Sequence, residues 1–215
     1  MISVVWDGEI VLAVHKPAGL PTQAPRGIES LESRLRRQLQ ARSSYVAFPH
    51  RLDRPVSGLV LVALTKRAAR LLSDQFASRK VHKVYVAEVD GEVTAAHALW
   101  VDWLRKLDGV AQAEVCDADA AGAKNAETVV ERLRYMPQRN TSLLKLSPTT
   151  GRMHQLRVQS SHRGHPIVGD SLYAIAKQPA TGPCERIHLH AQSLTFHDPR
   201  NSLSVCVAVD HEFAD

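Results

Sequence analysis

The sequence predicts an α+β fold, with a mixed, mainly antiparallel β-sheet core and flanking helices. Many short apolar or alternating runs are typical of strands, whereas only two or three stretches have helical periodicity. The 215 residues, 44% of them hydrophobic and 23% charged, suffice for one sizeable core and could hold a second small lobe. Without an internal repeat, a low-complexity segment or a clear linker, residues 1–215 read as one domain, with no separate N-terminal module.

The first third of the chain predicts two strands and one helix. Residues 10–14 form a short apolar run that stops at the turn Lys16-Pro17-Ala18-Gly19. Residues 29–42 carry leucines at four-residue intervals, which predicts an amphipathic helix with a basic outer face. Residues 50–55 have no regular period and predict a loop. The continuous apolar run 58–64 predicts a strand buried on both faces.

The middle of the chain predicts one helix, one strand and a region of loops. Thr65 can cap a helix over residues 66–79, whose apolar stripe is Ala69, Leu72 and Phe76. Residues 83–89 predict another strand. Residues 94–124 predict loops around a short apolar piece at 99–104.

The last third predicts paired strands, a helix and a final strand. Residues 128–133 and 143–146 are expected to pair, and residues 151–164 to begin as a turn and continue as a helix. Apolar residues alternate over 203–209, which is typical of a half-buried strand.

Charge and cysteine content restrict the function class. The 27 Lys and Arg exceed the 22 Asp and Glu, and the resulting +5 and pI near 9.3 modestly favour a polyanionic partner. Three scattered cysteines, Cys116, Cys184 and Cys206, form no CxxC pair and fit a reducing cytoplasm. We find neither a signal peptide nor a run of about 20 apolar residues. We therefore expect a soluble cytoplasmic protein.

The segment His50-Arg51-Leu52-Asp53-Arg54-Pro55-Val56-Ser57-Gly58 carries the first candidate for chemistry. Its acidic residue, Asp53, is flanked by Arg51 and Arg54, and neighbouring cations favour an ionised carboxylate. An ionised carboxylate can act as a nucleophile or a base. The alternative is that Asp53 only pairs with an arginine to fix the loop, and this segment alone leaves both open.

Three further segments carry candidates. Tyr85, in Lys83-Val84-Tyr85-Val86-Ala87-Glu88-Val89, could stack on a base or relay a proton, although such a tyrosine is more often a core residue. The run Thr149-Thr150-Gly151-Arg152-Met153-His154-Gln155-Leu156-Arg157 would place His154 and Arg157 on one helical face, suited to phosphates or a carboxylate; the alternative is a solvated basic face. In Arg186-Ile187-His188-Leu189-His190-Ala191, Leu189 could face a pocket.

Together these segments resemble the pseudouridine synthases, specifically their RluA-type branch. HRLDRPVSGL is similar to the family's HRLD-x-x-TSG signature, and TGRMHQLRVQ…GHPIVGD to its second signature, with KVYVAEV between them. The resemblance runs from Val14-His15-Lys16-Pro17-Ala18-Gly19 to Leu189-His190-Ala191. Val56 replaces the usual threonine, and Gln159 stands where a histidine is common.

The resemblance implies roles for particular residues. Asp53 matches the catalytic aspartate, Tyr85 the active-site tyrosine and Arg157 the arginine that pairs with the aspartate. Leu189 matches the apolar residue near the target base, and Arg51 the side chain that fills the stack where the uridine leaves. His50, Arg54, Arg152 and His154 complete our substrate-binding candidates.

The implied reaction converts uridine to pseudouridine in structured RNA, in rRNA or tRNA stem-loops, and needs neither cofactor nor metal. We expect a monomer that binds RNA and no membrane. A metalloenzyme is one rival, because His162 and His165 lie three apart and His188 and His190 two apart, but no HExxH or paired CxxC occurs. A non-catalytic RNA-binding or assembly factor that retains the fold is the other.

Overall fold

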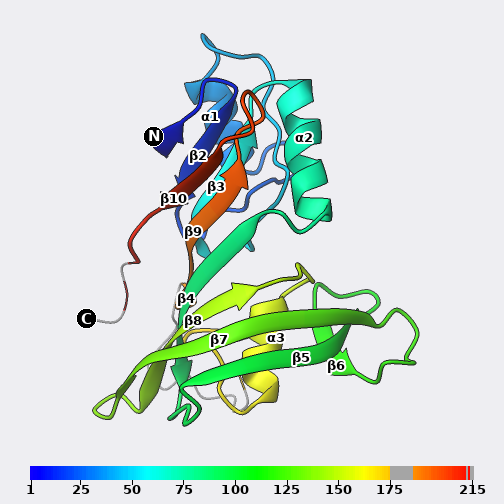
Figure 1. Ribbon diagram of the computed structural model, residues 1–215, viewed down its shortest axis with the longest axis vertical. Helices are drawn as coiled ribbons and strands as arrows, with labels where there is room; N and C mark the ends of the chain where they lie inside the picture. Colours follow the sequence, from blue (N-terminus) through cyan, green and yellow to red (C-terminus); the bar gives the residue numbers. More distant parts are fainter. Residues whose placement is uncertain (175–185, 212, 214–215) are drawn as a thin grey trace. The chain divides into compact units, whose positions relative to one another are not determined.

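The computed structural model describes residues 1–174, 186–211 and 213, and it consists of two compact units (Figure 1). Unit 1 comprises Met1–Lys83 and His190–His211, and unit 2 comprises Val84–Leu189 and Glu212–Asp215. The predicted α+β class is confirmed, while one catalytic domain built from both units stays a prediction. Cys184 lies outside the described residues. No helix in the described ranges is long and apolar enough to cross a membrane.

Unit 1 is a mixed sheet in which β1, β2, β3 and β9 follow one another, and β10 also pairs with β9. Its strands are antiparallel except for one pair: β3 and β9 run parallel, with Ser57 opposite His190 and Gly58 opposite Ala191. Strands β2 and β3 confirm the runs predicted at 10–14 and 58–64. The bounds are β1 Ser3–Asp7, β2 Val11–Lys16, β3 Ser57–Ala63, β9 Leu189–His197 and β10 Ser204–Ala208.

Two helices flank the unit 1 sheet. Helix α1 spans Leu31–Gln38 and is shorter than the predicted 29–42 at both ends. It begins after Ser30, which caps it in a reciprocal pair of hydrogen bonds with Ser33. Helix α2 spans Lys66–Ala77, and the Oγ1 of Thr65 accepts a hydrogen bond from the Ala68 amide at 3.1 Å. The predicted cap is therefore confirmed.

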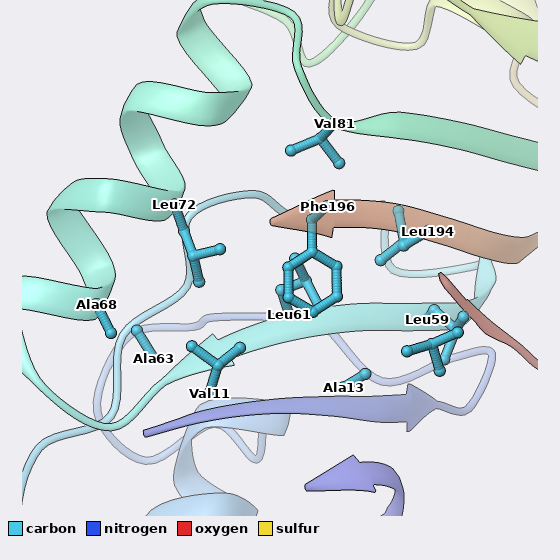
Figure 2. Packing of buried hydrophobic residues seen from close by; sticks show 11 residues of the cluster. Val11, Ala13, Leu59, Leu61, Ala63, Ala68, Leu72, Val81, Leu194 and Phe196 are labelled. Carbon is cyan, nitrogen blue, oxygen red and sulfur yellow. The ribbon is translucent and has the colours of Figure 1, made fainter. Parts of the chain in front are cut away.

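The core of unit 1 lies between α2 and the strands β2, β3 and β9. Figure 2 shows Leu72 of α2 pointing toward Leu61 of β3 and Phe196 of β9, all three fully buried. The intervening residues Val60 and Val62 of β3 are buried as well, so both faces of this strand are covered, as predicted. Each such aliphatic side chain contributes roughly 2 kcal/mol of burial free energy.

Unit 2 is an antiparallel sheet in the order β4-β8-β7-β5-β6. The strands predicted at 128–133 and 143–146 pair as expected but are longer. The bounds are β4 His82–Asp90, β5 His97–Lys106, β6 Ala113–Cys116, β7 Lys124–Met136 and β8 Thr141–Pro148. The first two residues of β4 belong to unit 1.

The prediction of loops over residues 94–124 was wrong, because this segment contains β5 and β6. In β5 the apolar residues Leu99 and Val101 point outward and are 61% and 48% exposed. Asp102, between them and the next turn, is buried instead. The buried face also holds the apolar Trp100 and Leu104, so both faces of β5 carry apolar residues and the alternation that normally marks a strand is lost.

Helix α3 spans Gln155–His162 and packs on the inner face of the unit 2 sheet. Its Val158 lies in a buried cluster with Leu104 of β5, Ala113 of β6 and Ala126 of β7. The predicted turn followed by a helix is confirmed. His154 precedes the helix in the left-handed region, with φ 52°, so it does not share a helical face with Arg157 as predicted from their spacing.

Candidate active site

The loop that carries Asp53 is tethered to the rest of unit 1 through its backbone. The Oγ1 of Thr22 donates to the Leu52 carbonyl at 2.9 Å and accepts from the Leu52 amide at 3.2 Å. On the other side of Asp53, the Gly19 amide donates to the Arg54 carbonyl at 2.9 Å. Asp53 itself is half-buried. These hydrogen bonds fix the backbone on both sides of Asp53, while its side chain stays partly exposed to solvent.

Lys16 is a further tether that the sequence reasoning missed. Its side chain is fully buried, and its ammonium donates to the carbonyls of Pro17, Leu20 and Arg54 at 3.0, 2.7 and 3.2 Å. Burial lowers the pKa of Lys16 to about 8, and the negative charge of Asp53 partly counteracts this. The sequence did contain one indication of this role, since Lys16 is a charged residue at the end of a buried strand and directly before Pro17.

His50 has a structural role in this loop. Its Nε2 accepts a hydrogen bond from the Leu61 amide of β3 at 2.9 Å, and its ring stacks on Phe76 with centroids 4.5 Å apart. Burial, with a smaller contribution from the charge of Lys83, lowers the pKa of His50 to about 3. The ring is therefore neutral at pH 7 and joins the loop to β3. Contact of His50 with substrate stays a prediction.

Arg51 and Arg54 flank Asp53 and are both exposed. The Nε of Arg54 donates to the Gly19 carbonyl at 2.9 Å, which leaves its terminal nitrogens toward solvent. Arg51 forms no hydrogen bond or ion pair among the described residues. Both side chains are thus available to an incoming ligand, as the predicted roles require.

The backbone conformation and close surroundings of Gly58 explain why the segment from His50 to Gly58 ends in glycine. Its φ of 118° is one that side-chain-bearing residues rarely adopt. A Cβ at this position would lie 2.5 Å from the amide nitrogen of Ala191 and 2.8 Å from its carbonyl carbon. Only glycine therefore lets β9 approach β3 here. The neighbouring Ser57 hydroxyl hydrogen-bonds Nδ1 of His190 at 2.9 Å and closes the same junction.

In unit 2, Tyr85 lies on β4 opposite Leu146 of β8 and is half-buried. Three residues along β4, the buried carboxylate of Glu88 accepts hydrogen bonds from Thr141, Arg139 and Nδ1 of His188 at 2.7 to 2.9 Å. Burial alone would raise the pKa of Glu88, but the hydrogen bonds of His188 and Thr141 outweigh it and lower the pKa.

This cluster also fixes the backbone ahead of Leu189. The carbonyl of His188 accepts from the Glu88 amide at 3.0 Å, and the amide of His188 donates to the Val168 carbonyl at 2.9 Å. Leu189 follows directly and is 3% exposed. Its predicted place near a target base remains a prediction.

Arg157 is held by a bidentate ion pair with Asp170. Its Nε and Nη2 donate to the two carboxylate oxygens of Asp170 at 2.7 and 2.8 Å, and both side chains are buried. Its guanidinium also lies over the ring of Tyr173, 5.1 Å from the centroid. Nδ1 of His154 and the Tyr173 hydroxyl are 2.7 Å apart. The two fingerprint segments TGRMHQLR and GHPIVGD thus join through Arg157 and Asp170.

Buried amides attach α3 to the sheet of unit 2. Gln155 donates to the Glu127 carbonyl and the Thr128 hydroxyl at 3.0 Å each. Gln159, which is fully buried, donates to the Asp102 carboxylate at 2.7 Å and accepts from the Thr128 hydroxyl at 2.7 Å. Arg152 is anchored too, because its Nε donates to the Asn125 carbonyl at 2.8 Å. These residues orient the helix that carries Arg157.

Two of the histidines raised as metal ligands, His188 and His190, have other contacts. His188 bonds Glu88, and His190 bonds Ser57 and lies beside His15, with ring centroids 5.6 Å apart. Among residues 1–174, 186–211 and 213, no group of three or more His, Cys, Asp or Glu is arranged to hold a metal ion.

Comparison with known proteins identifies the family. The model of a family described as RNA pseudouridylate synthase matches residues 10–162, which is more than half of the chain. The chain belongs to this family. It is 36% identical over 206 residues to the dual-specificity RNA pseudouridine synthase RluA of Vibrio vulnificus, covering 92% of this chain and 78% of that protein.

Two further similar proteins support the same family assignment. The mitochondrial tRNA pseudouridine(32) synthase of Saccharomyces cerevisiae is 36% identical over 175 residues, which are 80% of this chain and 37% of that enzyme. The solved structure of human RNA pseudouridylate synthase domain containing 1 aligns with a TM-score of 0.82 at 27% identity, covering 100% of this chain and 85% of that one. The chain is therefore an RluA-type RNA pseudouridine synthase, and the predicted family and enzyme class are confirmed.

Proposed function

We propose that this synthase isomerises specific uridines in rRNA or tRNA stem-loops, with Asp53 as its catalytic carboxylate. The observation that carries the proposal is the HRLD segment, which lies inside the family match on a loop tethered on both sides of Asp53. The name of the yeast relative specifies tRNA, and that of the bacterial relative a dual RNA specificity.

The reaction breaks the N1–C1′ bond of uridine and forms a C5–C1′ bond in the same site. The carboxylate of Asp53 either attacks C1′ or assists departure of the base, and a base later removes the C5 proton. Tyr85 stacks on the uracil and assists. By the family resemblance Arg157 corresponds to the arginine that orients the catalytic aspartate, and the bidentate bond to Asp170 supports this role because it fixes the guanidinium.

The target uridine has to leave its stack, which costs a few kcal/mol. Arg51 fills the vacated place, and its exposure supports this role. Leu189 packs near the base, while Arg54, Arg152, His154 and His50 contact the substrate. Loops, whose bases are already splayed, are the substrates that require the least unpairing.

The substitution Asp53→Asn tests the proposal, with Asp108→Asn in the exposed β5–β6 turn as the matched control. Each variant is expressed in a host that lacks its own synthases of this branch, and total RNA is mapped by carbodiimide labelling and primer extension. Wild type and the control should give a new pseudouridine stop that Asp53→Asn lacks, with RNA affinity within a few-fold.

A new stop that persists in Asp53→Asn would overturn the role of Asp53. Absence of any stop with the wild-type protein would instead favour the non-catalytic RNA-binding factor.

The protein is further proposed to act in the cytoplasm as a monomer, without a metal or cofactor. The chemistry supports the last point, since no atom is oxidised and no group is lost. Activity should therefore survive treatment with a chelator, and its loss would contradict the assignment.

A further inference from the structure

Helix α2 differs from helix α1 in how its cations are neutralised. The outward arginines of α1 are paired: Arg34 and Arg37 both contact Glu29, at 2.5 and 2.9 Å. In contrast, five exposed cations of α2 and the turn after it form no ion pair within the described part of the chain. We call this set the α2 basic face; it consists of Lys66, Arg67, Arg70, Arg79 and Lys80.

The packing of α2 directs these side chains to solvent. Ala68 and Leu72 are fully buried against β2, β3 and β9, as Figure 2 shows, so the opposite side of the helix is its outer face. Lys66 and Arg70 are four residues apart and Arg67 and Arg70 three apart, so like charges are neighbours on that face.

This arrangement is unfavourable for the free helix. Like charges at these spacings destabilise a helix by a few tenths of a kcal/mol per pair, and the first turn of α2 contains no acidic residue to offset them. The acidic residue of the helix, Asp74, is exposed and forms no ion pair with Arg70 among the described residues.

Resting on the proposed function, we infer that the α2 basic face binds the phosphate backbone of the substrate RNA. It contributes affinity without reading sequence, since phosphate contacts position a nucleic acid and base contacts specify it. No large hydrophobic residue of α2 is exposed beside these lysines and arginines. Such a surface fits a phosphate backbone better than a folded protein partner.

Two double variants of equal charge change test the inference. Arg67→Gln with Arg70→Gln removes two charges from the α2 basic face, whereas Arg34→Gln with Arg37→Gln removes two from α1. The affinity of each full-length protein for a transcribed RNA stem-loop is measured from 0.05 to 0.3 M salt, together with pseudouridine formation in the same RNA.

The α2 variant should bind on the order of tenfold more weakly at 0.1 M salt, with its salt slope reduced by about 1.4 to 1.8, and the loss should lie in KM. The α1 variant should keep the wild-type slope. Equal losses in both variants, or none in either, would overturn the inference. Failure of the wild-type protein to form pseudouridine would instead refute the proposed function and leave the comparison of slopes intact.

Discussion

Gly58 lies where the parallel strands β3 and β9 meet, and we expect Gly58→Ala to destabilise unit 1 strongly. The new methyl group would lie 2.5 Å from the Ala191 nitrogen and 2.8 Å from its carbonyl carbon, far inside van der Waals contact. These are backbone atoms of a hydrogen-bonded strand, so they cannot turn aside as a flexible side chain could. The two strands have to separate locally.

The magnitude follows from two contributions. A φ of 118° costs alanine about 1 to 3 kcal/mol, and the overpacking at Ala191 costs about 1 to 3 kcal/mol more. We therefore expect a loss of about 2 to 6 kcal/mol in the free energy of unfolding. In a chain of this length the melting temperature should fall by roughly 4 to 24 °C.

The same chain supplies a matched control. Gly27 also has a positive φ, 89°, but a Cβ there would meet no atom within 4 Å. Gly27→Ala isolates the backbone contribution and should cost about 1 kcal/mol. Urea unfolding followed by circular dichroism, with amide hydrogen exchange in β3 and β9, compares the two variants. Equal losses in both would refute the argument that the approach of β9 requires glycine.

Two other predictions concern buried polar groups. Gln159→Leu deprives Asp102 and Thr128 of their amide partner, so the free energy of unfolding should fall by about 2 to 4 kcal/mol. Gln159→His should restore part of this loss. If thermal unfolding of Gln159→Leu matches that of the wild type, the amide contributes nothing. The pKa of His50, about 3 against its ordinary 6.5, gives stability that is complete above pH 6.5 and is lost as pH falls toward 3. Urea midpoints should therefore fall less between pH 7 and 4 in His50→Gln, which can still accept from Leu61, and parallel curves for the two proteins would contradict this.

Elements whose buried residues are also apolar could be predicted from the sequence. The run 58–64 has no polar residue, so its burial on both faces followed directly. The cap at Thr65 followed from local chemistry alone. In β5, by contrast, the buried side contains Asp102 and the exposed side Leu99 and Val101. Because Trp100 and Leu104 on the buried side are apolar too, apolar residues lie on both faces and the sequence of β5 has no periodic signal.

The residues of the candidate site likewise fall into those that the sequence identified and those that it did not. Asp53, Tyr85 and Arg157 were identified by the resemblance of their motifs, because each lies in a contiguous signature. Their supporting residues were not, since the partner of Arg157 is Asp170, 13 residues away, and Lys16 reaches a carbonyl 38 residues away. The left-handed His154 likewise depends on tertiary contacts that spacing does not contain.

The chain leaves unit 1 after Lys83 and returns at His190. During synthesis, unit 1 therefore stays incomplete until the whole of the intervening segment has been made. Strand β3 acquires its parallel neighbour only when residues 133 positions later emerge from the ribosome. Until then its apolar edge is open, and open edges of this kind invite intermolecular pairing. Prior folding of residues 84–189 would bring the two ends of that long span together and shorten the search. The central unit is thus an insertion that can prepare closure of the surrounding one.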